Sequence, residues 1–273
     1  MFQKKRNDEI DNSEFGVRLS WNYKQTFMTL SFWRGFAPGG SYYLNEVQKF
    51  RRLVFDPRAG FPFVVAEFER QYPRIKLLGF TLDKELVFVG QKLKAATAPV
   101  LRIEAMYSFD EKFNTWETVM GPMGPVDINK IDDTDFFRYM IAFDWPIRIK
   151  WINPQKNVFI SPQFFHFYTF NHHSGDRSPN MMSERVPQNW YFFTFKVSTE
   201  YLNERVLPSV LYVMDCHSGA AWCMTECGFR IGNHWRPKLR WLWVGKGHKH
   251  NPPRSFNVWE DRDQITLRIE YQF

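Results

Sequence analysis

The sequence has no long apolar run, few cysteines and no apolar segment near its start. Because no stretch of about 18 consecutive apolar residues occurs in the chain, a membrane-spanning helix is excluded. The three cysteines are too few for a disulfide framework, and their odd number leaves at least one thiol unpaired. Residues 4–6 are basic, but Asn, Asp and Glu follow where a signal peptide needs an apolar stretch.

Aromatic residues are abundant in a chain that is otherwise polar. They make up 18% of the residues, with 28 Phe, 11 Trp and 11 Tyr, while the mean hydropathy is −0.44. A soluble fold must bury most large rings in one core, whereas a membrane barrel displays them to lipid and in girdles at both interfaces. The net charge of +7 fits binding to nucleic acid, binding to anionic lipid or simple solubility equally well, so it does not separate these classes. The aromatic content favours a membrane barrel.

The last nine residues carry the clearest secondary-structure signal. Apolar residues (Ile265, Leu267, Ile269, Tyr271, Phe273) alternate there with polar ones (Thr266, Arg268, Glu270, Gln272). This period of two predicts a strand with lipid on one side and water on the other. The ending on Tyr271 and Phe273 resembles the C-terminal signal that the insertion machinery of outer-membrane barrels reads. An amphipathic strand at the end of a soluble sheet is the alternative.

Similar segments recur along the chain and give eleven candidate strands. They cover residues 14–22, 25–34, 73–82, 99–109, 135–145, 157–170, 189–201, 206–216, 220–231, 237–245 and 265–273. The shorter links between them (22–24, 83–98, 146–156, 202–205, 232–236) alternate with long polar ones (35–72, 110–134, 171–188, 246–263), with 217–219 as a short exception. Short periplasmic turns opposite long extracellular loops are typical of outer-membrane barrels. The sequence therefore predicts an all-β, antiparallel transmembrane β-barrel.

The number of candidate strands predicts how the chain is organised. Bacterial single-chain barrels have an even strand number, because both chain ends lie in the periplasm. Eleven strands and no export signal together predict the C-terminal part of a larger barrel, with one or more strands upstream of Met1. A miscounted strand is the alternative explanation. Residues 1–13 are expected to be a disordered or linker start, and residues 14–273 the barrel domain.

The alternation also assigns a face to each side chain. Phe137, Tyr139 and Ile141 are expected to meet lipid, while Arg138 and Asp144 on the same strand point inward. An inward position is favoured because an Arg or Lys facing lipid at the midplane costs about 2–4 kcal/mol. The candidate lumen-lining residues are Arg18, Arg102, Glu104, Arg138, Asp144, Lys196, Glu200, Glu226, Arg230, Arg240, Arg268 and Glu270. Their mixed signs indicate either an ion-paired wall that stiffens the barrel or a polar conduit that selects its solute.

Residues 99–170 resemble a known family in the order and spacing of four motifs. The motifs are Val100-Leu101-Arg102-Ile103-Glu104-Ala105, Arg138-Tyr139-Met140-Ile141-Ala142-Phe143-Asp144, Trp151-Ile152-Asn153-Pro154 and Phe159-Ile160-Ser161-Pro162-Gln163-Phe164-Phe165-His166. This stretch is similar to outer-membrane proteins of the domain of unknown function 1302 family, and weaker similarity extends from about residue 14 to the end. Members of that family are longer, with a signal peptide and a preceding N-terminal half.

The resemblance implies a barrel in the outer membrane that works beside a periplasmic lipoprotein and an inner-membrane exporter of the resistance-nodulation-division type. It implies no catalytic residues and no cofactor. Two features depart from a regular barrel. Pro162 falls inside a strand, where it marks a bulge, an edge or a bend, and the link 83–98 is long for a periplasmic turn.

No group of residues predicts catalysis or metal binding. The possible metal ligands Asp215, Cys216, His217, Cys223, Cys227 and His234 match no established zinc spacing, and the two later cysteines share the apolar face of their strand. The pairs His172-His173 and His248-His250 fall in expected loops. Neighbouring residues such as His217 and Ser218, or His173 and Ser174, point to opposite faces of a strand and make no nucleophile–base pair.

Three functions remain open after these exclusions, and none is enzymatic or involves nucleic acid. The first is a porin-like channel or exporter-associated conduit for a hydrophobic or amphiphilic solute. The second is a structural or partner-binding barrel with a plugged lumen. The third is a soluble all-β binding domain.

Overall fold

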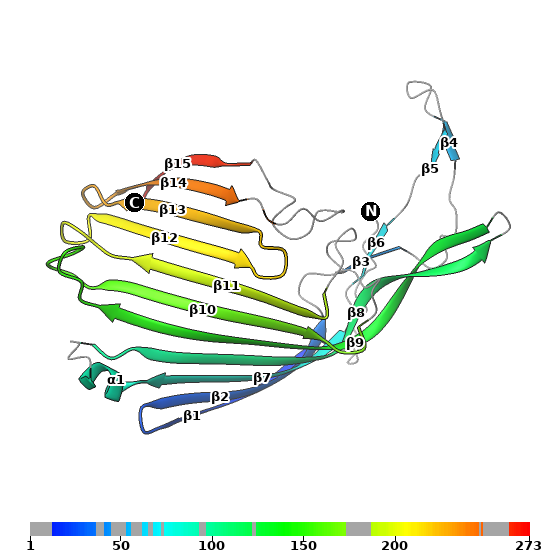
Figure 1. Ribbon diagram of the computed structural model, residues 1–273, viewed down its shortest axis with the longest axis horizontal. Coiled ribbons are helices and arrows are strands. Elements are labelled where there is room, and N and C mark those ends of the chain that lie inside the picture. The colour runs from blue at the N-terminus through cyan, green and yellow to red at the C-terminus, as the bar shows by residue number, and fades with distance from the viewer. Residues whose placement is uncertain are drawn as a thin grey trace.

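A single large antiparallel sheet dominates the structure, which is a computed structural model (Figure 1). The structure describes residues 13–36, 41–44, 53–55, 62–64, 68–71, 74–92, 97–121, 124–172, 187–245, 247 and 262–273. The predictions for residues 1–12, His173, Ser174 and His248–His250 lie outside the described residues.

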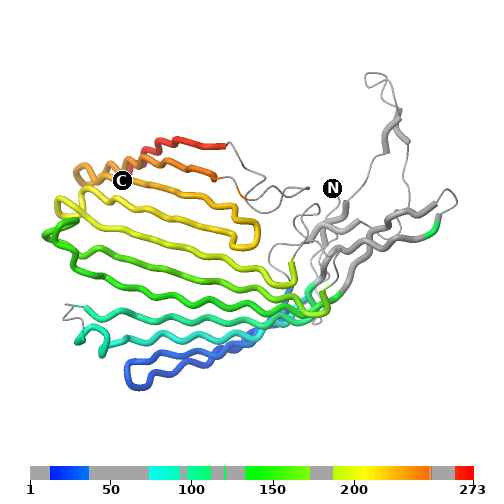
Figure 2. Tube along the Cα trace, in the orientation of Figure 1, coloured from blue at the N-terminus to red at the C-terminus, as the bar shows by residue number. Residues whose placement is uncertain are grey.

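Eleven strands form this sheet, and their order in the sheet is their order along the chain. They are β1 (Phe15–Tyr23), β2 (Thr26–Phe36), β7 (Arg74–Glu85), β8 (Val100–Gly121), β9 (Gly124–Ile147), β10 (Val158–Thr169), β11 (Asn189–Ser198), β12 (Val206–Asp215), β13 (Ala221–Phe229), β14 (Trp235–Gly245) and β15 (Gln264–Tyr271). The colour in Figure 2 accordingly runs from blue at one edge of the sheet to red at the other. The predicted all-β antiparallel fold and its eleven strands are confirmed, and the sheet is open between β1 and β15.

The shorter connections gather at one end of the sheet, which we call the turn end, and the opposite end is the loop end (Figure 1). The β1–β2 turn is the tightest, and Lys24 and Gln25 have φ angles of 43° and 60°. Two consecutive positive φ angles are typical of the type I′ turn that joins twisted strands. The link 83–98 contains the helix α1 (Val87–Lys92), which accounts for its length. No helix in the described part of the chain is long and apolar enough to cross a membrane.

The prediction of a loop over residues 110–134 is wrong, because β8 and β9 continue through it as a paired hairpin. The hairpin projects beyond the neighbouring strands at the loop end (Figure 1). A register shift between Ser108 and Glu111 marks a β-bulge, where Asp110 has a φ of 59°. The bulge changes the phase of the apolar–polar alternation, which is why the sequence pattern ends there.

Four short strands lie within the predicted loop 35–72. β3 (Ser41–Leu44) pairs with β6 (Phe68–Gln71), and β4 (Leu53–Phe55) pairs with β5 (Pro62–Val64). Pro162 lies inside β10 at neither a bulge nor an edge, because the β9–β10 register is the same at Ile160 and Gln163 on either side of it. The proline interrupts the pairing with β9 for two residues and leaves the register unchanged.

The strand register divides the side chains of the large sheet into two faces. Face A carries Val17, Leu19, Trp21, Met28, Leu30, Phe32, Leu78, Phe80, Leu82, Ile103, Ala105, Tyr107, Tyr139, Ile141, Phe143, Ile160, Phe164, His166, Tyr191, Phe193, Phe195, Val210, Tyr212, Met214, Cys223, Thr225, Cys227, Leu239, Trp241, Trp243, Ile265, Leu267 and Ile269. Face B carries the alternate positions. Each of the two faces is therefore continuous across all eleven strands.

Burial differs between the two faces. Buried residues within the strands lie on face B, apart from Thr26, Val158, Ala221 and Gly245 at strand ends. Side chains crowd together on the inner side of a curved sheet, so this distribution indicates that the sheet curves toward face B. The predicted lipid-facing residues are then on the outer side.

Candidate functional site

The candidate site is face B, where the structure brings most of the predicted lumen-lining residues together. Those on face B are Arg18, Arg102, Glu104, Arg138, Asp144, Lys196, Glu226, Arg240, Arg268 and Glu270. Within the part of the chain that the structure describes, Arg18, Glu104 and Lys196 have no ion-pair partner. The others form ion pairs across neighbouring strands or within one strand.

The strand positions predicted for Glu200 and Arg230 are wrong, because β11 ends at Ser198 and β13 at Phe229. Both residues lie at the turn end. Glu200 pairs with Lys156 at 2.8 Å, and Arg230 pairs with Glu204 at 2.6 Å. The hydrogen bond to Glu200 raises the pKa of Lys156. These pairs join adjacent turns instead of lining face B.

Asp144 is the centre of a polar network on face B. Ser161 donates a hydrogen bond to one carboxylate oxygen of Asp144 at 2.5 Å, and Arg102 contacts the other at 3.1 Å. Arg102 also contacts Asp83 at 3.1 Å, and Gln163 donates to the hydroxyl of Ser161 at 3.0 Å. Asp144 and Ser161 are both buried. The network therefore links four strands, β7 to β10, around the buried pair of Asp144 and Ser161, while the side chains of Arg102 and Asp83 stay partly exposed.

A second network occupies β13 to β15. Arg240 contacts Glu226 at 2.7 Å, and Arg268 contacts Glu270 at 2.7 Å. Lys238 lies directly opposite Arg268 in the register and reaches Glu270 at 3.9 Å. Like charges opposite each other on neighbouring strands repel, so Glu270 is placed to offset the repulsion between two cations.

The ion pair between Arg138 and Glu111 depends on the β-bulge. Two distances of 2.7 and 2.8 Å join one guanidinium nitrogen of Arg138 to the two carboxylate oxygens of Glu111. Odd-numbered residues of β8 before the bulge lie on face A. If the alternation continued without a shift, Glu111 would also lie on face A, on the side of the sheet opposite Arg138. The phase change at Asp110 brings Glu111 to face B. Sequence reasoning missed this partner because it treated residue 111 as part of a loop.

Face B is aromatic in its loop-end half, a feature that the sequence analysis also missed. Phe167 on β10 lies 6.3 Å from Trp190 and 5.6 Å from Phe192 on β11, measured between ring centroids. Phe136 packs against Phe167, and the Arg138 guanidinium lies 4.3 Å from the centre of its ring. We call the group Phe136, Phe165, Phe167, Trp190 and Phe192 the aromatic zone. The charged residues near Asp144 and Glu270 occupy the turn-end half.

Two buried hydroxyl groups border the aromatic zone. Ser108 and Thr169 flank Phe136 in the register, and both are fully buried. Neither hydroxyl has a hydrogen-bond partner among the residues that the structure describes. A buried hydroxyl without a partner costs about 1–3 kcal/mol, since it has lost its bonds to water.

Replacing Thr169 with valine is therefore expected to stabilise the protein by about 1 kcal/mol, because the shape is kept and the unpaired hydroxyl is removed. The matched control is Thr29→Val, because Thr29 is equally buried but shares a 2.7 Å hydrogen bond with Thr81. The control is expected to lose stability by about 1–3 kcal/mol. Urea unfolding of both variants measures the difference, and equal losses at the two sites contradict the account of Thr169.

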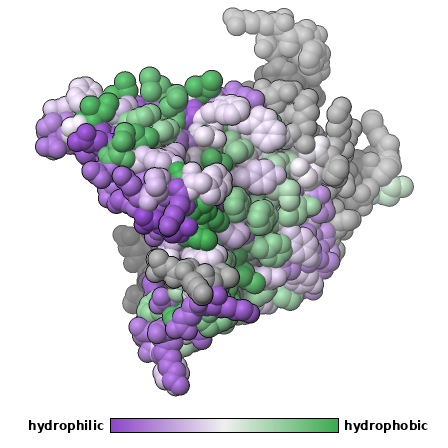
Figure 3. Space-filling view, turned by 60° about the vertical axis from the view of Figure 1, so that its left-hand side comes forward, coloured by the Kyte–Doolittle hydropathy of each residue, from purple (hydrophilic) through white to green (hydrophobic). Residues whose placement is uncertain are grey.

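Face A exposes large apolar side chains along its whole width. Leu19 is 59% exposed, Ile141 in the middle of the sheet 41%, Trp241 52% and Leu267 65%. Outside the projecting part of the β8–β9 hairpin, its charged residues in the described strands lie near the two ends of the sheet: Arg34, Arg74, Lys76 and Asp135 at the loop end and Lys84 at the turn end. Figure 3 shows hydrophobic residues along the top of the molecule, where Figure 1 places β13 to β15, with hydrophilic residues below them.

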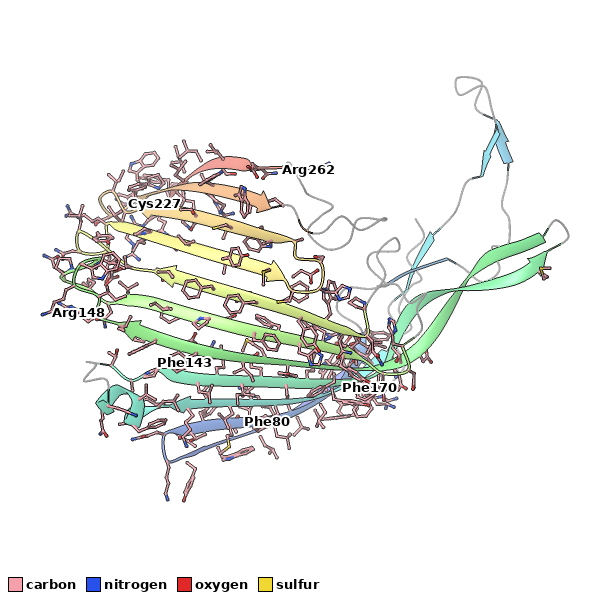
Figure 4. The ribbon with its side chains drawn as sticks, viewed as in Figure 1. Phe80, Phe143, Arg148, Phe170, Cys227 and Arg262 are labelled. Atoms are coloured by element: carbon pink, nitrogen blue, oxygen red, sulfur yellow. The ribbon has the colours of Figure 1, made fainter. Side chains whose placement is uncertain are left out.

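Face A has aromatic rings near both ends of the strands, in addition to rings such as Phe80, Phe143 and Phe193 between the ends. Trp21, Tyr23, Trp145, Trp235 and Tyr271 lie toward the turn end, and Phe15, Phe109, Phe137, Tyr168, Tyr191 and Trp243 toward the loop end. Figure 4 gives the two ends as landmarks, with Arg148 at the turn end, Phe170 at the loop end and Phe143 on the strand between them. His166 belongs to the loop-end group, where it stacks on Tyr191 at 4.5 Å and hydrogen-bonds Asn189 at 3.0 Å.

The cysteines are free thiols in two different settings. Cys216 is exposed in the β12–β13 turn at the loop end, whereas Cys223 and Cys227 are half-buried on face A. Partial desolvation, followed by the charge of Asp215, raises the pKa of the Cys216 thiol. Among the described residues, no group of three or more His, Cys, Asp or Glu side chains is arranged to hold a metal ion.

These features define an all-β protein with one open antiparallel sheet, apolar on one face and mainly polar on the other. The chain matches no protein-family model, no curated protein and no solved structure. The resemblance of residues 99–170 to the domain of unknown function 1302 family stays a prediction.

Proposed function

We propose that this sheet is the wall of an outer-membrane β-barrel that acts as a channel or exporter-associated conduit for an amphiphilic or hydrophobic solute. Face A is then the lipid-facing surface, and face B lines the lumen. The observation that carries the proposal is the continuous apolar face across all eleven strands, on which leucine, isoleucine and tryptophan side chains remain exposed. A water-soluble monomer rarely exposes an apolar surface of that extent.

The dimensions and the ends of face A support the same proposal. Outside the long pair β8 and β9, the strands of the sheet contain 8–12 residues. A tilted strand needs about 9–11 residues to cross a bilayer. Aromatic rings at both ends of an apolar band are typical of the two membrane interfaces. The resemblance to an outer-membrane family, and a lipoprotein or inner-membrane exporter as partner, belong to this proposal.

A barrel closed by its own side chains is the second candidate, and the ion pairs of face B favour it. Arg102, Asp144 and Ser161 form a satisfied network, as an ion-paired wall would require. Single-channel recording of the protein in planar bilayers separates the two candidates. Steps of conductance support the channel, whereas membrane-inserted protein without conductance supports a plugged, partner-binding barrel.

The native cysteines test which face meets lipid. After folding into phosphatidylcholine vesicles, Cys216 is expected to react with a hydrophilic maleimide, while Cys223 and Cys227 are shielded by acyl chains. The double variant Cys223→Ala/Cys227→Ala isolates the first thiol, and Cys216→Ala isolates the other two. Because the pKa of Cys216 is raised, its labelling rate is expected to keep increasing between about pH 7 and 9 as thiolate forms.

The control for this labelling is the same protein unfolded in urea, in which all three thiols react. Protein that stays soluble without detergent or lipid contradicts the membrane proposal and supports a soluble all-β domain. Equal labelling of Cys216, Cys223 and Cys227 in vesicles also contradicts the membrane proposal.

A further inference from the structure

The turn-end half of face B separates its charges across the sheet. On β7 to β9 the carboxylates Asp83, Glu85, Glu104 and Asp144 face a single cation, Arg102, and we call this group the acidic arc. On β14 and β15 the cations Arg236, Lys238, Arg240 and Arg268 form the basic arc. Among the described residues, Glu226 and Glu270 are the carboxylates that offset the four cations in that part of face B. The positive and negative charges of face B are therefore similar in number, but they are concentrated on different sides of the sheet.

The two arcs are centred six strands apart, since β8 is the fourth strand of the sheet and β14 the tenth. In a closed barrel of about a dozen strands, positions six strands apart lie on opposite sides of the lumen. The acidic and basic arcs then face each other across the turn-end half of the lumen. Opposed charges of this kind produce a field across the lumen that orients a dipolar group.

The aromatic zone lies next to these arcs, in the loop-end half of the same face. Phe165 and Phe167 on β10 and Trp190 on β11 supply apolar rings, and Phe165 pairs with Phe192 in the register. Apolar rings on a wall that is otherwise polar offer a surface for the hydrocarbon part of a solute. Face B therefore combines an apolar half and a dipolar half along one axis.

We propose that face B binds zwitterionic amphiphiles, with the apolar part on the aromatic zone and the head group between the acidic and basic arcs. This inference rests on the proposed function, because it needs face B to enclose a lumen. An amphiphile with one charge meets attraction from one arc and repulsion from the other. A zwitterion satisfies both arcs at once.

The test uses vesicle-reconstituted protein and four short probes. Hexylphosphocholine is the zwitterion, hexyl sulfate and hexyltrimethylammonium carry one charge each, and glycerophosphocholine has the head group without the chain. Isothermal titration calorimetry against protein-free vesicles measures each affinity. Hexylphosphocholine is expected to bind about tenfold more tightly than each of the other three, because only it engages both arcs and the aromatic zone.

Two substitutions at exposed residues test the roles of the acidic and basic arcs in binding. Glu104 has no ion-pair partner among the described residues, and the side chain of Arg268 is 70% exposed, so neutralising either one is expected to leave the fold intact. Glu104→Gln and Arg268→Gln are each expected to weaken hexylphosphocholine binding by about fivefold. They shift the balance between hexyl sulfate and hexyltrimethylammonium in opposite directions. Arg148→Gln, at the turn end and away from face B, is the control and leaves all four affinities unchanged.

The outcomes separate this inference from the proposed function. Protein that inserts into vesicles but binds the zwitterion no better than the charged amphiphiles overturns the inference and leaves the barrel in place. The inference is also overturned if Glu104→Gln and Arg268→Gln shift the balance between hexyl sulfate and hexyltrimethylammonium in the same direction. Protein that does not insert at all overturns both. Preferential hexylphosphocholine binding that is weakened about fivefold in both charge variants supports the inference whether or not the lumen conducts ions.

Discussion

Replacing Asp144 with alanine is expected to lower the free energy of unfolding by about 2–3 kcal/mol. The carboxylate accepts the hydroxyl proton of Ser161, which is 1% exposed, and pairs with Arg102. Removing it leaves a buried hydroxyl without its acceptor and a guanidinium with Asp83 as its remaining ion-pair partner. Both losses fall on the same variant, so the expected effect is large.

The control for Asp144 is Glu104→Ala on the neighbouring strand. Glu104 is an exposed acidic residue of the same face and pairs with no cation in the described part of the chain, so its removal is expected to change stability by less than about 0.5 kcal/mol. Chemical unfolding in one detergent or lipid, with the same slope for both variants, gives the comparison. A similar small effect at both sites contradicts the central role of Asp144.

Replacing Leu19 with arginine is expected to cost about 2–4 kcal/mol of folding free energy in phosphatidylcholine vesicles. Leu19 is the middle residue of β1, lies on face A and is 59% exposed. In a lipid environment this position is near the bilayer midplane, where a guanidinium loses its hydration. In water the same substitution at an exposed site costs little, so the size of the effect reports what face A contacts.

The neighbouring residue Ser20 provides a matched control for Leu19. Ser20 is also exposed in β1 but points to face B, so Ser20→Arg is expected to fold as well as the unchanged protein. Reversible unfolding from vesicles measures both variants. Equal and small effects at Leu19 and Ser20 mean that face A meets water, which removes the basis for a membrane function.

The alternation of apolar and polar residues was sufficient to predict all eleven strands and the sharing of faces. It succeeded where a strand has one apolar and one polar face, as in β15, where Ile265 and Leu267 alternate with Thr266 and Arg268. It failed at residues 110–134, because the bulge at Asp110 inverts the phase of the pattern. A pattern of period two contains no information about where an extra residue enters a strand.

The strand ends near Glu200 and Arg230 were predicted too far along the chain for another reason. Tyr201 and Ile231 make isolated bridges to Val206 and Trp235, so the apolar pattern continues although the regular ladder has ended. The aromatic zone was missed because β10 has rings on both faces, with Phe164 on one and Phe165 on the other. Where both faces are aromatic, alternation cannot assign an inner and an outer side. Only the register with β9 and β11 does so.

The bulge at Asp110 also determines how the chain tolerates changes in length. The residues of β8 that precede the bulge cannot change in number. One inserted or deleted residue after Val100 would turn Ile103 toward the lumen and Glu104 toward lipid in the proposed barrel. A deletion of Asp110 itself would instead restore regular pairing, with Glu111 still opposite Thr134 on face B. Natural variants that differ in length are thus expected to add or lose residues at the tip of the β8–β9 hairpin, with the root conserved residue for residue.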